Sequence, residues 1–545
     1  MRRLLLFSAL VLTAACAASA APPPASFDIV VYGGTSGGIA AAVEATRHGR
    51  TVVVVSPDQR IGGLSTNGLG HTDIGNKHIV GGVSLEFYQA IRAYYESPDA
   101  WRQQRRSDYR YAGQGVAKAD TQAMWTFEPS AALAVFEDWV QRDNIRVLRG
   151  ERLVRPGGVT VEEGRIRSIE LESGQRITGR AFIDATYEGD LLAAAGVSYT
   201  VGREANSQYG ETLNGVQTAH AVNHQLLPGV DAYARPGDPS SGLLPGIDPT
   251  GPGAEGAADH RVQAYCFRMC LTDAPGNRVP FHRPSGFREE EYELLFRNFE
   301  AGLDFAPLTL HRMPNLKTDS NNNGGFSTDY IGQNYEYPEA GYQRRAEILR
   351  SHLTYQQGLM WVLANHPRVP QKIRDQMSEW GVCRDEFTET EGWPPCLYVR
   401  EARRMVGPVV MTQHHCQGRE LAEDSVGMAA YTMDSHNVQR YVDHDGHARN
   451  EGDVQVGGFP PFPISYRSIV PQAGECTNLW TPVCLSASHI AYGSIRMEPV
   501  FMILGQSSAA AASIAVQRDI DAQDVHYAEL REVLLREQQV LAGKK

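Results

Sequence analysis

The sequence predicts an α/β fold in which a parallel sheet, built from both ends of the chain, holds a long inserted α+β segment. Three observations predict this fold. A strand, a glycine-rich turn, a helix and a second strand follow one another within residues 28–55. A further strand and turn lie at 181–190, and an apolar, alanine-rich stretch follows near the C-terminus. From about 204 to 464 this alternation does not recur, so we expect an insertion there.

The first strand and turn have the pattern of a dinucleotide site. Residues 28–32 are a short apolar run typical of a buried parallel strand, 39–45 are an alanine-rich helix, and 51–55 are a second apolar strand. In Rossmann-like folds the glycines of such a turn let the backbone approach a pyrophosphate, whose charge lies at the helix N-terminus. The turn consists of Gly33, Gly34, Thr35, Ser36, Gly37 and Gly38.

Two positions depart from the G-x-G-x-x-G fingerprint. Gly33 and Gly38 fill its first and last places, but Thr35 stands in the middle. Either the Thr35 hydroxyl contacts a phosphate directly, or the loop is slightly displaced. An acidic residue normally binds the adenosine ribose after the second strand, whereas Ser56 holds that place here, with Asp58 two residues later. A glycine-rich turn without a ligand is the alternative interpretation.

Later segments resemble the glutathione-reductase-type flavoproteins. Their second segment often reads R-x-G-G and runs beneath the cofactor toward the flavin ring, and it is matched here by Arg60, Gly62, Gly63 and Leu64. A helix from 127 to about 144, a strand at 145–148 and a β-meander from 158 to about 177 follow. The turn that closes the FAD site in these proteins, A-T-x-x-G-D, is matched by Ala185, Thr186 and Asp190. The resemblance implies a Rossmann-like FAD-binding domain.

The C-terminal part of the chain continues this resemblance. Residues 496–507 lead into an alanine-rich helix that ends near 516. Related flavoproteins direct the positive end of such a helix at the flavin pyrimidine, which stabilises negative charge on the reduced ring. We therefore expect cofactor contacts from Gly505, Gln506 and Ser507.

The whole chain is similar to one bacterial family of FAD-dependent oxidoreductases. Members are often exported, and some carry a xanthan lyase label. The resemblance implies the fold and an FAD cofactor, but no substrate. It is carried by residues 72–77, 202–206, 398–407, 434–437 and 486–491.

The length of 545 residues favours at least two domains. We expect a discontinuous FAD-binding domain at 21–203 and 465–530, and a substrate or cap domain at 204–464. Residues 1–20 are expected to be a cleaved signal peptide, because Arg2 and Arg3 precede a short apolar run and small residues end it.

The signal peptide predicts a periplasmic or secreted protein. Lipid attachment at Cys16 is a weaker alternative, because Thr13 stands where Leu or Val is expected. No later segment is predicted to span a membrane, and the net charge of −12 argues against a nucleic-acid partner. The cysteines lack a C-x-x-C spacing, so no metal site is expected, and Cys383 and Cys396 are the pair that we expect to be bridged.

Candidate catalytic residues come from histidines and arginines in polar segments. Oxidation by a flavin requires a base that takes a proton, and histidine suits that role near neutral pH. By position we rank His436 and His489 first and His71 next, although each is equally typical of a structural histidine. Arg404 and Arg496 are candidates for binding a carboxylate or a hydroxyl that develops charge, with a structural Arg–Glu network as the alternative.

The chain carries one dinucleotide fingerprint, so a separate NAD(P)H site is not expected. The sequence therefore favours a dehydrogenase or oxidase that takes electrons from a small hydroxyl- or amine-bearing substrate, possibly derived from carbohydrate, and passes them to oxygen, a quinone or a redox protein. The alternatives are a carbohydrate lyase of the xanthan type that contains FAD, and a sugar-binding protein without catalysis.

Overall fold

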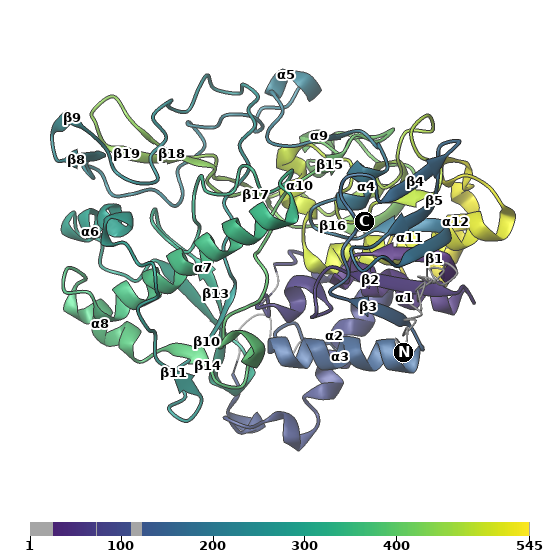
Figure 1. The fold of residues 1–545 in the computed structure, drawn as a ribbon, viewed down its shortest axis with the longest axis horizontal. Coiled ribbons are helices and arrows are strands. Elements are labelled where there is room, and N and C mark those ends of the chain that lie inside the picture. Colours follow the sequence, from purple (N-terminus) through teal and green to yellow (C-terminus); the bar gives the residue numbers. More distant parts are fainter. Residues whose placement is uncertain (1–24, 72, 111–122, 544–545) are drawn as a thin grey trace, which may run out of the picture.

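The computed structural model describes residues 25–71, 73–110 and 123–543 of the chain. The predicted signal peptide and Cys16 lie outside the described residues. Figure 1 shows two regions, one around a mainly parallel sheet that carries both ends of the described chain, and one around a smaller antiparallel sheet with its own helices.

The first region is a parallel sheet in the strand order β3-β2-β1-β6, with β22 pairing with the other side of β6. The central strands β1 and β2 form because they are rich in β-branched residues, and β2 and the second half of β1 are buried on both faces. Each fully buried valine of β2 contributes roughly 1.5–3 kcal/mol. The strands of this sheet are β1 (Ala25–Tyr32), β2 (Val52–Ser56), β3 (Arg146–Arg149), β6 (Arg176–Asp184) and β22 (Leu479–Trp480).

The predicted meander and the predicted strand near 181 share one long strand. β4 (Val159–Glu162) and β5 (Arg165–Glu170) are antiparallel, and β5 pairs with the first half of β6. The second half of β6 lies parallel to β22, while β1 runs along most of its length. β6 therefore ties the meander to the central sheet.

Helices from both ends of the chain cover this sheet. α1 follows the glycine-rich turn directly, and α11 packs along it although the two are more than 450 residues apart in sequence. The helices of this region are α1 (Ser36–Arg47), α2 (Gly82–Tyr94), α3 (Pro129–Arg142), α4 (Asp190–Ala194), α10 (His489–Ile495), α11 (Glu498–Arg518) and α12 (Tyr527–Arg536).

Helix α11 begins earlier than the sequence predicted. It starts at Glu498, with Pro499 in its first turn, instead of after the apolar stretch 500–504. Proline suits the first turn because no intrahelical partner awaits its missing N–H, whereas the apolar stretch alone is equally typical of a strand. Among the described residues, α11 is the one helix long and apolar enough to cross a membrane, and its apolar window is wholly buried inside the protein. It is a core helix.

The second region is inserted in the sequence between the N-terminal and C-terminal parts of the first region, and it has its own apolar core. Its antiparallel sheet has the order β11-β14-β10-β13-β12. The strands are β10 (Met269–Thr272), β11 (Arg278–Val279), β12 (Leu308–Arg312), β13 (Lys317–Asn322) and β14 (Gly381–Cys383). Its helices are α6 (Glu293–Glu300), α7 (Tyr342–Asn365) and α8 (Gln371–Ser378). The short helix α9 (Gln413–Cys416) packs on α10 of the first region, and α5 (Asn206–Tyr209) ends beside α9.

Short antiparallel pairs complete the fold. β15 pairs with β7, so the chain from the second region returns beside the first. The pairs are β7 (Tyr199–Thr200) with β15 (Arg404–Met405), β8 (Tyr233–Arg235) with β9 (Asp238–Leu243), β16 (Ser425–Ala429) with β21 (Phe462–Ser465), β17 (Met433–Ser435) with β20 (Val454–Val456), and β18 (Gln439–Val442) with β19 (Ala448–Glu451). The exact domain boundaries stay a prediction.

The cysteine pairing expected from the sequence is wrong in this structure. All seven cysteines of the described residues are free thiols. Cys383 lies opposite Cys270 on neighbouring strands, with 3.7 Å between the two sulfurs, and not beside Cys396. Proximity in the sequence around a proline turn was a poor guide, because the register of β10 and β14 determines which side chains meet.

Candidate functional site

A pocket opens at the carboxyl ends of β1, β2 and β6, where the strand order reverses on the two sides of β1. Such a switch point is where ligands bind in open α/β sheets. We call it the glycine-loop pocket. It has a volume of about 960 Å³, and its sheet-side lining includes Gly33, Gly34, Thr35, Pro57, Asp58, Arg152, Thr186, Tyr187, Glu188 and Asp190.

The glycines of the first turn are required by close backbone contacts. A Cβ on Gly33, whose φ is +115°, would lie 2.6 Å from the Thr186 amide nitrogen. A Cβ on Gly34 would lie 2.5 Å from the Ser56 hydroxyl, and one on Gly38 would overlap the carbonyl oxygen of Gly33. These contacts hold the turn tightly between the strand ends and leave its backbone at the pocket wall.

The structure shows how threonine replaces the central glycine of the fingerprint. The Thr35 hydroxyl donates to the Ala185 carbonyl oxygen at 2.7 Å and accepts from the Gly38 N–H at 3.1 Å. It is therefore the N-cap of α1, which satisfies one of the free N–H groups of the first turn. The hydroxyl points into the protein, while the residue as a whole still lines the pocket.

Several of the predicted cofactor residues have side chains held by other parts of the protein. Ser36 donates to the Glu498 carboxylate at 2.6 Å, and Ser56 donates to the Asp58 carbonyl oxygen at 2.8 Å. Arg60 donates to the Thr66 carbonyl oxygen at 2.8 Å and pairs with Glu389. Asp58, and not the buried Ser56, is the side chain that faces the pocket after β2.

The second glycine pair lies beside the first turn and is bridged to it by Tyr187. The Tyr187 hydroxyl accepts from the Leu64 N–H at 2.9 Å and donates to Glu498 at 2.8 Å. Gly62 and Gly63 both have positive φ, and a Cβ on Gly63 would overlap the Tyr187 hydroxyl. Burial raises the pKa of the Glu498 carboxyl, although three hydroxyl groups bind it.

The turn after β6 carries a cluster of charges. Thr186 accepts from the Gly189 N–H and binds Asp184, which fixes the turn. Asp190 pairs with Arg345 of α7 through two bonds of 2.7 and 2.9 Å, and with Arg403 at 2.9 Å. α7 thus covers this side of the pocket with an arginine that the sequence analysis did not select.

Gly505, Gln506 and Ser507 line neither this pocket nor the one described next. They lie in the interior of α11, where a Cβ on Gly505 would overlap the Gly37 carbonyl oxygen of α1. Gln506 accepts from the Val83 N–H, and Ser507 donates to the Val426 carbonyl oxygen. The N-terminal end of the helix is at the buried Met497, eight residues before Gly505, and Met497 lines the second pocket.

A second pocket, which we call the histidine pocket, lies between the N-terminus of α11 and the inserted region and has a volume of about 880 Å³. It brings together residues from segments that are far apart in the sequence. Its polar lining includes Asp73, His224, Arg268, His311, Tyr398, Asp434, His436, Gln455 and Arg496, with Met497 beside them.

His436 lies at the end of β17 with its ring fixed by a carboxylate. Its Nδ1 lies 2.7 Å from the Asp329 Oδ2, and Asp329 also pairs with Arg400 at 2.9 Å. Burial lowers the pKa of His436 to about 4, helped by Arg400 and Arg496 and opposed by Asp329. The ring is therefore neutral near pH 7, and donation from Nδ1 to Asp329 leaves Nε2 as a proton acceptor.

Asp434 and Arg496 complete this wall. The Asp434 Oδ2 lies 3.9 Å from the His436 Nε2 and 3.7 Å from the Arg496 Nη2. Burial raises the pKa of Asp434 to about 7, and Arg496 opposes this shift. Arg496 follows α10 and donates to the Tyr398 hydroxyl and to the Asp434 carbonyl oxygen, each at 2.9 Å.

His71 is not in the lining of the histidine pocket and instead packs against His311, which is. The ring of His71 stacks on His311 with 4.3 Å between the ring centroids, and the backbone N–H of His71 donates to the Asp319 carboxylate at 3.0 Å. Asp319 also binds Arg268 through two bonds of 2.8 Å. Burial lowers the pKa of His71.

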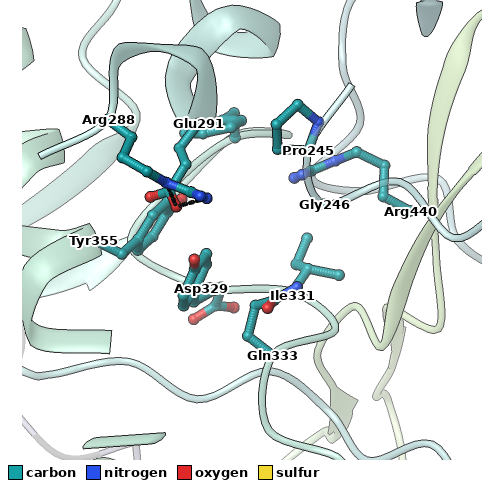
Figure 2. Close-up of a pocket in the computed structure, with 11 residues that line it drawn as sticks. Pro245, Gly246, Arg288, Glu291, Asp329, Ile331, Gln333, Tyr355 and Arg440 are labelled. Carbon is teal, nitrogen blue, oxygen red and sulfur yellow. Dashed lines mark hydrogen bonds and ion pairs between the residues drawn. The ribbon is translucent and has the colours of Figure 1, made fainter. Parts of the chain in front are cut away.

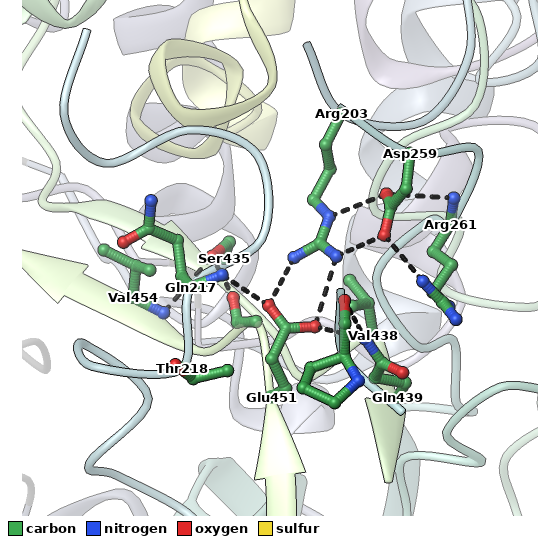
Figure 3. A network of polar contacts seen from close by, with 12 residues as sticks. Arg203, Gln217, Thr218, Asp259, Arg261, Ser435, Val438, Gln439, Glu451 and Val454 are labelled. Atoms are coloured by element: carbon green, nitrogen blue, oxygen red, sulfur yellow. Dashed lines mark hydrogen bonds and ion pairs between the residues drawn. The ribbon is translucent and has the colours of Figure 1, made fainter. Parts of the chain in front are cut away.

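His489 and Arg404 are not part of the pocket lining. His489 Nδ1 lies 2.7 Å from Glu401, and Arg404 pairs with Glu401 and Glu204. A neighbouring network joins Arg203 to Asp259 and Glu451 (Figure 3). Such placement matches the Arg–Glu network that the sequence left open as the alternative, and a direct catalytic role for either residue stays an untested prediction.

Two groups of side chains among the described residues have ligand atoms within 4.8 Å of one another, as a metal site requires. They are Glu44, His48 and Glu537, and Asp443, Asp445 and His447. Neither group lines the two pockets described above. The expectation that no metal is bound stays a prediction.

A family model described as FAD dependent oxidoreductase matches residues 28–534. The chain belongs to the FAD dependent oxidoreductase family. A search of curated proteins found no matching relative.

Solved structures also match this flavoprotein over part of its length. They include L-proline dehydrogenase from P. horikoshii, at 17% identity over 33% of this chain and 59% of that chain, with a TM-score of 0.24. The aromatic hydroxylase CabE matches at 19% identity over 33% of this chain and 35% of that chain, with a TM-score of 0.23. The myxobacterial halogenase CndH matches at 14% identity over 33% of this chain and 41% of that chain, with a TM-score of 0.23. The matched parts thus span about 35–59% of those chains.

FAD is the cofactor of this family, and the glycine-loop pocket fits its nucleotide end. The pocket lies at the N-terminus of α1, is walled there by Gly33, Gly34 and Thr35, and has Asp58 where the ribose is bound in such folds. Residues 396–399 line both pockets, since Cys396, Leu397 and Val399 face the glycine-loop pocket and Tyr398 faces the histidine pocket. When bound, FAD supplies a two-electron acceptor for hydride transfer.

The sequence analysis missed several residues that the fold brings to these pockets. Asp329 and Arg268 lie in segments without a recognisable motif, so no local signal indicated them. Asp434 and Tyr398 lay inside two of the stretches that resemble the family, but neither was selected as a site residue. One signal was available for Asp434. It stands two residues before the candidate His436 on a short strand, and side chains at i and i+2 of a strand share a face.

Proposed function

We propose that this FAD-dependent oxidoreductase is an exported dehydrogenase or oxidase that takes electrons from a small hydroxyl- or amine-bearing substrate in the histidine pocket. The supporting observation is the arrangement of His436, whose Nδ1 is held by Asp329 and whose Nε2 is free to accept a proton beside Asp434 and Arg496. A positioned base next to a cation is what oxidation of an alcohol or amine requires of the protein.

Arg496, His436 and Asp434 have different roles in the proposed reaction. The Arg496 guanidinium binds the substrate oxygen and stabilises the negative charge that grows on it as the proton leaves. The proton passes to His436 Nε2 or to Asp434 Oδ2, which face one another across 3.9 Å. Because the pKa of Asp434 is about 7, Asp434 is the better matched acceptor near neutral pH, and His436 positions the substrate hydroxyl.

The substrate class follows from the charges of the same wall. Arg268 and Arg496 both line the pocket, whose remaining lining is rich in asparagine and histidine side chains. Such a surface binds hydroxyl groups and carboxylates, so a sugar or a sugar acid is the substrate class that we favour. Since the chain has one dinucleotide fingerprint, oxygen, a quinone or a small redox protein is proposed as the electron acceptor.

The deciding experiment is an anaerobic reduction of the purified holoenzyme with candidate sugars, sugar acids and amines. A substrate that is oxidised bleaches the visible absorption of the flavin, and air restores it in an oxidase. The His436→Asn holoenzyme is the matched comparison, because it keeps the cofactor pocket unchanged. If no compound of these classes bleaches the wild-type flavin, the proposal fails.

A carbohydrate lyase is the second candidate, because the same wall offers a base beside Arg496, whose guanidinium would neutralise a uronate carboxylate. The same experiment separates the two candidates. An unsaturated product that forms without bleaching of the flavin supports the lyase and excludes the dehydrogenase for that substrate.

Export is proposed from residues 1–20. Fractionation of cells that express the full chain tests it, with a variant lacking residues 2–20 as the control. We expect the full chain outside the cytoplasm and shortened at its N-terminus by mass spectrometry. A full-length chain in the cytoplasm would contradict export without affecting the proposed chemistry.

A further inference from the structure

The inserted region contains a third pocket, which shares the wall residue Asp329 with the proposed chemistry but no residue that would contact the substrate of that chemistry. We call it the arginine pocket, and it has a volume of about 490 Å³. Figure 2 shows its lining from α7, from β18 and from the loops between. The residues that carry the argument are Gly246, Phe326, Asp329, Tyr330, Tyr355 and Arg440.

Arg440 is a buried cation without a carboxylate partner. It is 5% exposed, and its Nε and Nη2 donate to the Asn450 Oδ1 at 2.9 Å and to the Gly325 carbonyl oxygen at 3.1 Å. Among the described residues no carboxylate oxygen lies within 4.0 Å of its guanidinium. Burial lowers the pKa of Arg440 to about 10, so the side chain stays charged at neutral pH.

A buried and unpaired charge is costly, so this arrangement calls for a counter-charge. Other buried arginines of the chain have one, since Arg203, Arg268 and Arg345 each contact a carboxylate within 3 Å. Arg440 differs from them in this respect.

The third nitrogen of Arg440 is open to the pocket. Nη1 forms no hydrogen bond with any residue that the structure describes, and Figure 2 shows the guanidinium directed into the cavity beside Gly246. Gly246 has a φ of +82°, and a Cβ at this position would lie 3.4 Å from Nη1. The glycine therefore leaves the guanidinium uncovered.

The other charges of the arginine pocket are already neutralised. Arg288 pairs with Glu291, and Asp329 pairs with Arg400 and His436. One positive charge, that of Arg440, is left for a ligand. A single anionic group is therefore the charge that fits.

The apolar part of the wall is aromatic. Tyr330 and Tyr355 stack with 4.0 Å between their ring centroids and 9° between their planes, and Phe326 lies under the guanidinium at 5.2 Å. Tyr355 is buried between Tyr330 and Tyr292, so the half-buried Tyr330 is the ring that offers a flat face to the pocket. Such a face binds the face of an aromatic ring or of a sugar.

We propose that the arginine pocket binds a small molecule that carries one carboxylate on a ring, with Arg440 holding the carboxylate and Tyr330, supported from behind by Tyr355, facing the ring. The guanidinium has a planar fork that matches a carboxylate, and Nη1 is the donor available for it. Aromatic acids and uronic acids share this chemistry.

Isothermal titration of the holoenzyme with benzoate, D-glucuronate and inorganic phosphate tests the proposal. We expect saturable binding of one of the two ring carboxylates at concentrations up to about 10 mM, a range in which a Kd near 1 mM is measurable. Benzoate binding identifies an aromatic acid and glucuronate binding identifies a sugar acid. Binding of phosphate alone, or of none of the three, overturns the proposal.

The Arg440→Met variant assigns the binding to this pocket. It removes the charged guanidinium and keeps an unbranched apolar side chain that reaches about as far as Nε, so we expect a fold with unchanged FAD content and at least a tenfold weaker Kd. An unchanged Kd overturns the proposal, because the ligand then binds elsewhere, for example beside Arg496 in the histidine pocket.

Two variants at Gly246 keep the test valid if the Arg440→Met variant does not fold. Gly246→Asp places a carboxylate beside Nη1, and aspartate tolerates a positive φ better than most residues. Gly246→Asn has the same size and the same tolerance but no charge. We expect Gly246→Asp to weaken carboxylate binding much more than Gly246→Asn, and equal effects of the two variants would contradict the role of the charge.

Discussion

The glycine-loop pocket and the histidine pocket are built in different ways. The first is walled by the backbone of one turn and of the strand ends around it, at positions where a Cβ would collide with a neighbouring strand. The second is assembled from side chains such as His436 and Asp329, which lie 107 residues apart and meet only in the folded protein. A site made of backbone atoms can be recognised from a short stretch of sequence, whereas a site made of distant side chains depends on the whole fold.

The largest expected effect is at Gly38. In Gly38→Val the side chain overlaps the Gly33 carbonyl oxygen, and such overpacking costs roughly 1–3 kcal/mol or more. We expect the flavin-to-protein ratio, measured by visible absorption, to fall at least about tenfold, which corresponds to ~1.4 kcal/mol. Gly276→Ala is the control, because a Cβ there meets nothing within 4 Å. A fully loaded Gly38→Val protein would remove the basis for the glycine-loop pocket.

The histidine pocket is tested at His436. His436→Asn keeps a polar side chain but loses the proton acceptor, so kcat should fall roughly 10²–10⁴-fold, as for a lost general base or its positioning group. FAD content should not change, which is the contrast with Gly38→Val. His444→Asn serves as the control, since the His444 side chain is 89% exposed and does not line the histidine pocket. A normal kcat in His436→Asn would exclude this histidine from the chemistry.

The pH dependence of kcat separates Asp434 from His436. Asp434 accepts a proton only as a carboxylate, and burial raises its pKa to about 7, so kcat should rise with pH through about 7 and level off above it. His436, with a pKa of about 4, is already neutral across that range. In Asp434→Asn the step near pH 7 should vanish. A step that persists in this variant belongs to another group.

The smallest expected effect is at Thr35, whose hydroxyl caps α1. Thr35→Val keeps the shape and loses the cap, so the free energy of unfolding measured in urea should fall by about 0.5–2 kcal/mol. Thr35→Ser keeps the hydroxyl and should lose much less. Because the hydroxyl points into the protein, neither variant should lose its flavin, and loss of flavin in Thr35→Ser would show that the threonine methyl group matters for the pocket.

Local patterns in the sequence were sufficient for the framework of the FAD-binding region. Strand β1, the turn from Gly33 to Gly38 and helix α1 were all located correctly, because their pattern is contained within 20 residues. The start of α11 was placed too late, since an apolar stretch has no period that distinguishes a buried helix from a strand. Gly505 was read as a cofactor residue, although its lack of a side chain serves the contact with Gly37.

The histidine pocket was predictable only in part. His436 and Arg496 were selected from their position after or before recognised elements, and the structure places both in the pocket lining. His489 has the same kind of position but lies in a buried network with Glu401. No sequence rule separates these cases, because the difference depends on which side of a loop faces the inserted region. Asp329 and Arg440 could not have been found without the fold.

The contact between Gly37 and Gly505 ties the start of the chain to its end. During synthesis, helix α1 leaves the ribosome hundreds of residues before α11, the helix against which it packs. The hydroxyl of Ser36 therefore has no Glu498 carboxylate to bind until the C-terminal part of the chain has been made. Flavin capture is therefore a property of the finished chain. A chain that is cut short before residue 498 keeps the complete glycine motif and still lacks the surface that holds it in place.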